Sequence, residues 1–185
     1  MSLSAAKQAA REAAFSRRRA AFDADMGTGA GRLSELLAGH RGVPVAGYLP
    51  IRSEIDPRAA MVEASAHGPV MVPLIEAKAT PLRFALWEPD MALVPGPFGA
   101  EVPADPVFSV PQIVIVPLVA FTRAGARLGY GGGFYDRTLQ ALRASGPVLA
   151  VGFAFAAQEA EALPHDPNDQ PLDMIVTERE ILSPR

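Results

Sequence analysis

The segment from Gln112 to Phe121 constrains the fold of this chain most strongly. It reads QIVIVPLVAF, almost wholly apolar and rich in β-branched residues. A strand that is apolar on both sides is covered on both sides, as in a parallel sheet with helices on each face. Further strands are predicted over 43–49, 70–73, 80–88, 148–155 and 173–177, and helices over 4–22, 32–38, 58–66 and 134–145. This alternation predicts an α/β fold in three layers, with a mostly parallel central sheet flanked by helices.

Length and composition limit the classes of protein that fit. The 185 residues suit a single domain over 1–185. Hydrophobic residues make up 49% and charged residues 20%, a balance typical of globular rather than disordered chains. Cysteine is absent and no apolar run reaches about 20 residues, which excludes disulfides, cysteine-based zinc sites and membrane-spanning helices. The net charge of -3 argues against a general nucleic-acid binder. We expect a cytoplasmic monomer whose partners are small molecules.

A glycine-rich segment follows the strongest strand and precedes a predicted helix. It runs from Arg127 to Asp136 and holds glycine at four of the five positions 129–133. Glycines let the backbone approach a ligand closely, and free N–H groups at a helix start attract anions. Arg127 can grip a phosphate through a forked contact, and Asp136 can hold Mg²⁺ beside it. The pattern therefore favours a site for a magnesium–nucleotide.

Other interpretations of these residues are weaker. A Walker A loop needs Gly-Lys-Ser/Thr, which is absent, and a dinucleotide fingerprint needs glycine or alanine at Phe134. A Ser-His-Asp hydrolase lacks its Gly-x-Ser-x-Gly elbow, and the three histidines do not cluster in sequence. A flexible turn without a ligand remains the alternative, although four glycines beside a strand end are costly to order.

The same segment resembles the signature of the 5-formyltetrahydrofolate cyclo-ligase family, also called 5,10-methenyltetrahydrofolate synthetases. The matching residues are Gly125-x-Arg127-Leu128-Gly129-x-Gly131-x-Gly133-Phe134-Tyr135-Asp136-Arg137, preceded by the strand end Pro117 to Phe121. Three further blocks agree in order: Lys7 with Arg11; Tyr48 with Ser53 to Asp56; and Gly152, Phe155, Gln158, Leu163-Pro164, Asp169, Asp173 and Thr177. The resemblance therefore covers nearly the whole chain.

The resemblance implies a fold like that of ribose isomerases and CoA transferases (NagB/RpiA-like). It also implies ATP- and Mg²⁺-dependent conversion of 5-formyltetrahydrofolate to 5,10-methenyltetrahydrofolate, with release of ADP and phosphate. In that reaction the formyl oxygen is phosphorylated, N10 attacks the activated carbon, and phosphate leaves as the ring closes. Phosphate is a far better leaving group than oxide, so the protein has mainly to position groups and neutralise charge.

The resemblance also implies roles for individual residues. It places the helix over about 4–22 as an arm that caps ATP. The implied ATP-binding residues are Lys7, Arg11, Arg127, Leu128, Gly129, Tyr130, Gly131, Gly132, Gly133, Phe134 and Tyr135, with Arg127 and Tyr135 also catalytic. The implied substrate-binding residues are Leu49, Glu54, Trp87, Tyr130 and Phe134. The implied metal ligands are Asp136 and Asp169, with Asp173 in reserve.

Each role has a simpler alternative in the sequence itself. Lys7, Arg11 and Arg18 share one helical face, which could be only a solvated basic stripe. Glu54 could be an exposed loop acid, Trp87 a core aromatic, and the acids of the segment 164–171 turn residues.

Two positions differ from the usual family pattern. Gly132 stands where a basic residue is common, which leaves less positive charge for the γ-phosphate, although Arg127 and the N-terminal helix could compensate. Phe134 replaces the first tyrosine of a pair, so ring packing is kept and one hydroxyl is lost. Two other functions also stay open: a non-catalytic folate-binding protein, and a sugar-phosphate or CoA-ester enzyme on the same fold.

Overall fold

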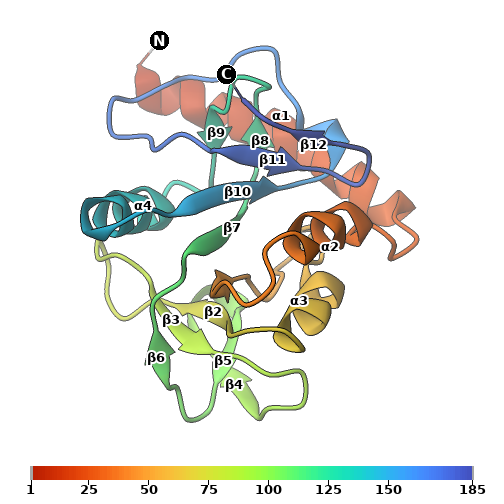
Figure 1. The fold of residues 1–185 in the computed structure, drawn as a ribbon. Helices are drawn as coiled ribbons and strands as arrows, with labels where there is room; N and C mark the ends of the chain where they lie inside the picture. Colours follow the sequence, from red (N-terminus) through yellow and green to blue (C-terminus); the bar gives the residue numbers. More distant parts are fainter. Residues whose placement is uncertain (1, 185) are drawn as a thin grey trace.

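The computed structural model describes residues 2–184 and contains a central sheet of eight strands (Figure 1). The strands lie in the order β12-β11-β10-β7-β1-β2-β3-β6. Their bounds are β1 Val45–Ala46, β2 Val70–Leu74, β3 Arg83–Leu86, β6 Phe108–Ser109, β7 Ile113–Pro117, β10 Leu149–Phe153, β11 Met174–Val176 and β12 Ile181–Leu182. The five central strands, β11 to β2 in this order, pair in parallel, and antiparallel strands close both edges. The predicted mostly parallel sheet is confirmed.

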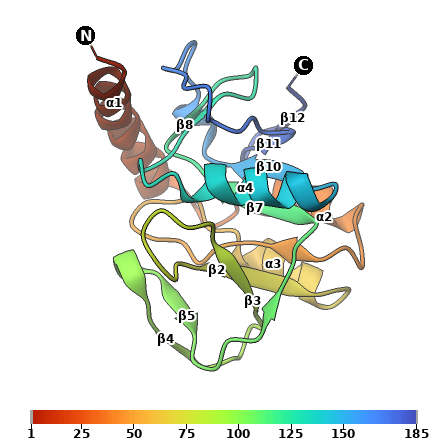
Figure 2. The ribbon, with the colours of Figure 1, turned by 90° about the vertical axis from the view of Figure 1, so that its left-hand side faces the viewer.

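Helices cover both faces of this sheet, as Figures 1 and 2 show. On one face α2 (Gly31–Ala38) and α3 (Arg58–Ser65) bury Leu33 and Ala60 against Ile113 and Val151. On the other face α4 (Phe134–Ser145) buries Leu139 against neighbours that include Val114 and Ala150. Because successive strand residues point to opposite faces, each central strand supplies both layers of core. This explains why the apolar run at 112–121 shows no alternation.

The predicted strand over 112–121 is wrong in one respect, because it consists of two strands. β7 ends at Pro117, and the chain then turns into β8 (Ala120–Phe121), which pairs with β9 (Arg127–Leu128) in a separate hairpin. Pro117 has no N–H to continue a ladder, which favours the break there. The expected strand over 43–49 shortens to β1, and the stretch 89–106 holds an unpredicted hairpin of β4 (Leu93–Pro95) and β5 (Glu101–Pro103).

The N-terminal helix α1 (Leu3–Ala24) packs at the end of the sheet where the parallel strands finish (Figure 2). Ala14 is fully buried against Val119, Ala120 and Leu128 of the β8–β9 hairpin. The helix thus lies beside the glycine-rich segment that leaves β9. Within residues 2–184, no helix combines the length and the apolar character that a bilayer crossing needs.

Candidate active site

The glycine-rich segment joins β9 to α4 at the carboxyl end of the sheet, which is where ligands bind in open α/β folds. Gly131 has φ +101° and Gly133 has φ +66°, backbone conformations that side chains rarely adopt. Gly133 is the N-cap of α4, and within residues 2–184 no side chain caps this end of the helix. The N–H groups of the first turn are therefore open to an anion, and the phosphate site expected from the sequence stays a prediction.

Gly131 offers a direct test of this backbone. A Cβ placed there would lie 3.0 Å from Nη2 of Arg11. We expect Gly131→Ala to raise the KM for ATP about tenfold, because strain of about 1–2 kcal/mol and a displaced Arg11 both oppose the bound arrangement. Gly27→Ala is the matched control, since Gly27 has φ +76° with no neighbour within 4 Å. An equal change in ATP KM for both variants would contradict the assignment of this loop.

Arg127 and Asp136 form an ion pair at the base of the segment. The Arg127 side chain is only 5% exposed, and its Nη2 contacts Oδ1 of Asp136. Its Nε donates to the carbonyl of Gln170 at 3.2 Å, while the Gln170 N–H donates to Asp136 at 2.9 Å. Burial lowers the pKa of Arg127, and the charges of Asp136 and Asp169 act against that shift. The guanidinium is therefore held in a fixed place beside Asp136, near enough to Asp169 for that charge to act on it.

The cations of α1 reach the same region. Lys7 Nζ donates to both oxygens of Asp169, at 2.9 and 2.7 Å, and Arg11 Nε donates to the carbonyl of Gly129 at 2.8 Å. Lys7 and Arg11 thus contact the glycine-rich segment and the 166–171 loop rather than forming a solvated stripe. Gln170 follows Asp169 in the chain and donates its N–H to Asp136, so both carboxylates lie in the region of Arg127.

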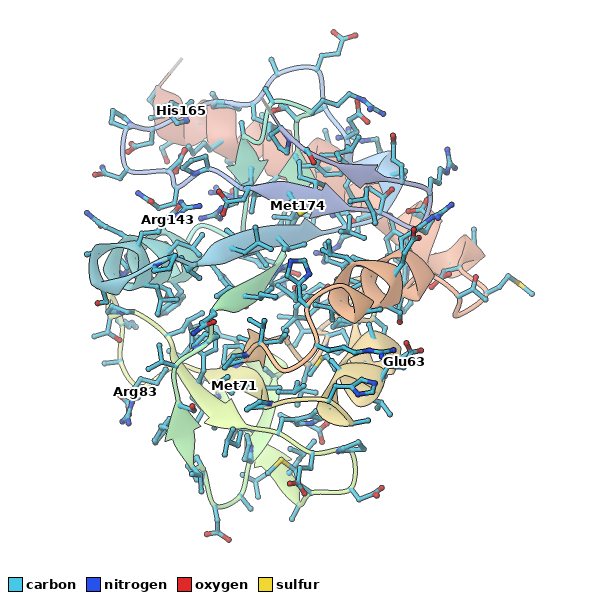
Figure 3. The ribbon with its side chains drawn as sticks, in the orientation of Figure 1. Glu63, Met71, Arg83, Arg143, His165 and Met174 are labelled. Carbon is cyan, nitrogen blue, oxygen red and sulfur yellow. The ribbon has the colours of Figure 1, made fainter. Side chains whose placement is uncertain are left out.

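Asp173, the reserve metal ligand, lies in a different environment. Its Oδ2 accepts from Arg143 Nη2 at 3.0 Å and from the Ala150 N–H at 2.7 Å. Figure 3 shows Arg143 on the α4 side of the sheet, near the start of β10. Asp173 therefore ties α4 to the start of a central strand.

Glu54 is buried rather than exposed, with 5% of its surface accessible. Its carboxylate accepts the Ile51 N–H at 2.8 Å. Burial raises the pKa of Glu54, and Ile51, Arg18, Tyr130 and Arg52 act in the opposite direction. Charged groups are rarely buried without a purpose, so this carboxylate is a candidate for ligand recognition.

Leu49 and Trp87 line a pocket of about 290 Å³ beside this carboxylate's loop. The other residues around the pocket are Pro50, Arg58, Pro89, Leu93, Gly99 and Glu101. Trp87 is 5% exposed and packs on Met61 and Val70, so it serves the core and the pocket together. A smaller pocket of about 70 Å³ between α2 and α3 contains none of the predicted site residues.

Two residues that contact the glycine-rich segment were not predicted from the sequence as part of the site. Phe98 adopts φ 59° while 67% exposed, and its ring centroid lies 6.4 Å from that of Phe134. Strained exposed residues gather at functional sites, but no local pattern marked this one. Arg137 Nη2 donates to the carbonyl of Gly132 at 2.6 Å, and its guanidinium lies over the Phe134 ring. Arg137 thus places a positive charge beside Gly132, where the loop itself has no basic residue. This arginine ends the sequence motif, and that position was the signal from which its contact could have been predicted.

Tyr135 and the two acids complete the predicted set. Tyr135 packs, partly buried, on the α4 side of the core, and burial together with Glu54 raises its pKa, so its phenol stays protonated. Among the described residues no cluster of three or more acidic, histidine or cysteine side chains could hold a metal alone. Asp136 and Asp169 supply two carboxylates, and Mg²⁺ commonly binds through one or two carboxylates plus substrate phosphates. The donor set therefore fits Mg²⁺ that arrives with a nucleotide.

Similarity to known proteins covers most of this chain. The profile of the 5-formyltetrahydrofolate cyclo-ligase family matches residues 3–178. The 5-formyltetrahydrofolate cyclo-ligase of Haemophilus influenzae is 35% identical over 143 residues, 71% of this chain and 74% of that protein. That of Mycolicibacterium smegmatis is 31% identical over 148 residues, 74% of each chain.

A solved structure extends the similarity to the whole fold. The NMR structure of the Aquifex aeolicus 5,10-methenyltetrahydrofolate synthetase superposes with a TM-score of 0.73 at 27% identity, covering 97% of this chain and 93% of that one. A profile match over nearly all of the chain, two relatives above 30% identity and a shared fold lead to one conclusion. This chain belongs to the 5-formyltetrahydrofolate cyclo-ligase family.

Proposed function

We propose that this protein converts 5-formyltetrahydrofolate to 5,10-methenyltetrahydrofolate, with MgATP as cosubstrate. One observation carries the proposal beyond family membership: the glycine-rich segment and a buried carboxylate meet at Tyr130. Tyr130 belongs to the glycine-rich segment, and it lies close enough to Glu54 that the two perturb each other's pKa. Phosphoryl transfer needs the two substrates side by side, and this arrangement provides adjacent binding sites for them.

On the ATP side, the open N–H groups at the start of α4 bind phosphate oxygens, supported by the backbone from Leu128 to Gly133. Arg127 holds the transferred phosphate, and Lys7 and Arg11 close over it from α1, the capping arm. Lys7 is only 17% exposed, so its charge acts in a region with little screening by water. Asp136 and Asp169 would hold Mg²⁺, which supplies charge neutralisation of the phosphates when bound.

On the folate side, Glu54 accepts hydrogen bonds from the amino and ring N–H groups of the pterin. Leu49 and Trp87 line the neighbouring pocket with apolar surface. Phe134 and Tyr130 form the side of the folate site that faces ATP. The neutral phenol of Tyr135 can donate a hydrogen bond to the reacting oxygens.

The reaction then balances in two steps. The formyl oxygen forms a bond to the γ-phosphorus as the bond to ADP breaks, with Arg127 beside the charge that develops. N10 attacks the activated carbon and loses its proton, and the formyl oxygen departs with the phosphate. No covalent bond to the protein is needed, which agrees with a site free of cysteine.

The variant Glu54→Gln tests two effects. The KM for 5-formyltetrahydrofolate reports folate recognition, and the melting temperature reports the cost of the buried charge. Removing the charged acceptor is expected to raise the KM for 5-formyltetrahydrofolate about 10- to 100-fold, because hydrogen bonds to charged groups contribute about 1.5–3 kcal/mol. The raised pKa of Glu54 means that the fold favours its protonated form. The ionised carboxylate therefore costs stability above that pKa, and the neutral variant should melt at a higher temperature at pH 7. The gain should vanish at low pH, where Glu54 is protonated in both folded and unfolded protein. A lower melting temperature at pH 7 would contradict this account.

The activity itself is tested by the absorbance of methenyltetrahydrofolate. Purified protein is mixed with 5-formyltetrahydrofolate and MgATP, beside controls without ATP and with EDTA. We expect product only in the complete mixture. Saturable folate binding without product would instead indicate a non-catalytic binder. Absence of binding by both ligands would point to a sugar-phosphate or CoA-ester enzyme on this fold.

A further inference from the structure

Arg18 is the most deeply buried charge in α1 and has no role in the mechanism above. It is 1% exposed, although arginine is among the residues least often buried. Its Nε donates to Ser53 Oγ at 3.1 Å, and its Nη1 is buried with no hydrogen-bond partner among residues 2–184. A buried guanidinium that is only partly hydrogen-bonded costs free energy, so its retention calls for a compensating interaction.

Arg18 is surrounded by residues at or next to the proposed folate site, including Tyr130 and Ser53. Its guanidinium carbon lies 5.4 Å from the centroid of the Tyr130 ring and 5.2 Å from that of Phe15. The Phe15 and Tyr130 rings are themselves 5.7 Å apart. Ser53, its hydrogen-bonded partner, is the residue immediately before Glu54. One side chain of α1 therefore contacts both the folate loop and the glycine-rich segment.

We propose that Arg18 is a positioning residue for the folate site. From the N-terminal helix it places Ser53 and Tyr130 and sets a fixed positive charge beside Glu54. The inference rests on the proposed function, since it assigns Glu54 to folate. The same helix holds Lys7 and Arg11, which we assign to ATP. Packing of α1 against the rest of the fold therefore completes the folate site and the ATP site together.

The charges around Glu54 support this role. Arg18 from α1 and Arg52 from the same loop favour the carboxylate, and burial disfavours it. Three tyrosines also face it: Tyr48 after β1, Tyr130 in the glycine-rich segment and Tyr135 in α4. The pKa of each tyrosine is raised, so they stay neutral and cannot replace Arg18 as a source of positive charge. Loss of Arg18 leaves Arg52 as the remaining cation among these groups.

The test compares Arg18→Gln, which removes the charge, with Arg18→Lys, which keeps it. Steady-state kcat and KM for both substrates are measured from pH 5 to 9. We expect Arg18→Gln to raise the KM for 5-formyltetrahydrofolate about tenfold at neutral pH, with little change in the KM for ATP. Its loss of folate affinity at acidic pH should begin at a higher pH than in the parent, because Glu54 is then more easily protonated. Arg18→Lys should restore the parent pH profile.

The controls separate this role from a purely structural one. Arg19→Gln is the matched control, because Arg19 is exposed and contacts Asp23 and the Phe22 ring on its own helix. Ser53→Ala removes the acceptor of Arg18 Nε while keeping both charges, and it should weaken folate binding if Arg18→Gln is too unstable to purify. An unmoved pH profile in Arg18→Gln, or parent-like folate KM in both Arg18→Gln and Ser53→Ala, would overturn the inference. An inactive parent protein would instead overturn the proposed function.

Discussion

Arg127→Ala is expected to lower kcat by about 10³-fold or more, the range seen when an arginine that stabilises a transferring phosphoryl group is removed. The structure gives the reason: this guanidinium is held by the Gln170 carbonyl and Asp136 at the base of the glycine-rich segment. Its position is therefore set before ATP arrives, and no reorganisation is needed as charge develops. The measurement is single-turnover formation of methenyltetrahydrofolate at saturating MgATP.

The same substitution should also destabilise the fold by about 1–3 kcal/mol, because two partly buried acceptors lose their donor. Circular dichroism should still show folded protein at assay temperature. Arg123→Ala is the matched control, since Arg123 pairs with Glu159 and Glu180 at the surface, away from the site. If Arg127→Ala keeps parent kcat, or if it unfolds outright, Arg127 is structural rather than catalytic.

Asp136→Asn is expected to lower kcat by about 10²- to 10³-fold at fixed Mg²⁺ and to raise the Mg²⁺ concentration needed for half-maximal rate. Charge stabilisation by a bound metal contributes several kcal/mol, and each 1.4 kcal/mol is about tenfold in rate. Asp169→Asn should behave in the same direction, because the charge of Asp169 also acts on Arg127 and its carboxylate is held by Lys7.

Asp173→Asn distinguishes the two candidate second ligands. Asp173 is engaged by Arg143 and by the Ala150 N–H, so its loss should lower the melting temperature and leave the Mg²⁺ dependence unchanged. A shift of the Mg²⁺ requirement in Asp173→Asn together with none in Asp169→Asn would reverse the assignment.

The sequence by itself determined the order of the main elements and the position of the glycine-rich segment directly before α4. The apolar run before Pro117 could only be a strand covered on both faces, and the bounds of α1, α2 and α4 agree with their predicted ranges to within two residues. The glycines and Arg127 allowed an anion site to be predicted because both signals are local. Hydrophobic period, helix start and backbone freedom each depend on residues only a few positions apart.

Only the tertiary structure decided which distant residues meet. Lys7 and Asp169 are 162 positions apart, and their ion pair depends on α1 lying beside the loop that precedes β11. Burial of Glu54 and Arg18 was equally unpredictable, since each resembled an ordinary surface charge in sequence. Strand order and helix docking set these contacts through the summed packing of the whole core, which no short segment encodes. The residue types of the candidate site could be predicted from short sequence segments. The burial and neighbouring charges that shift their pKa values depend on the whole fold.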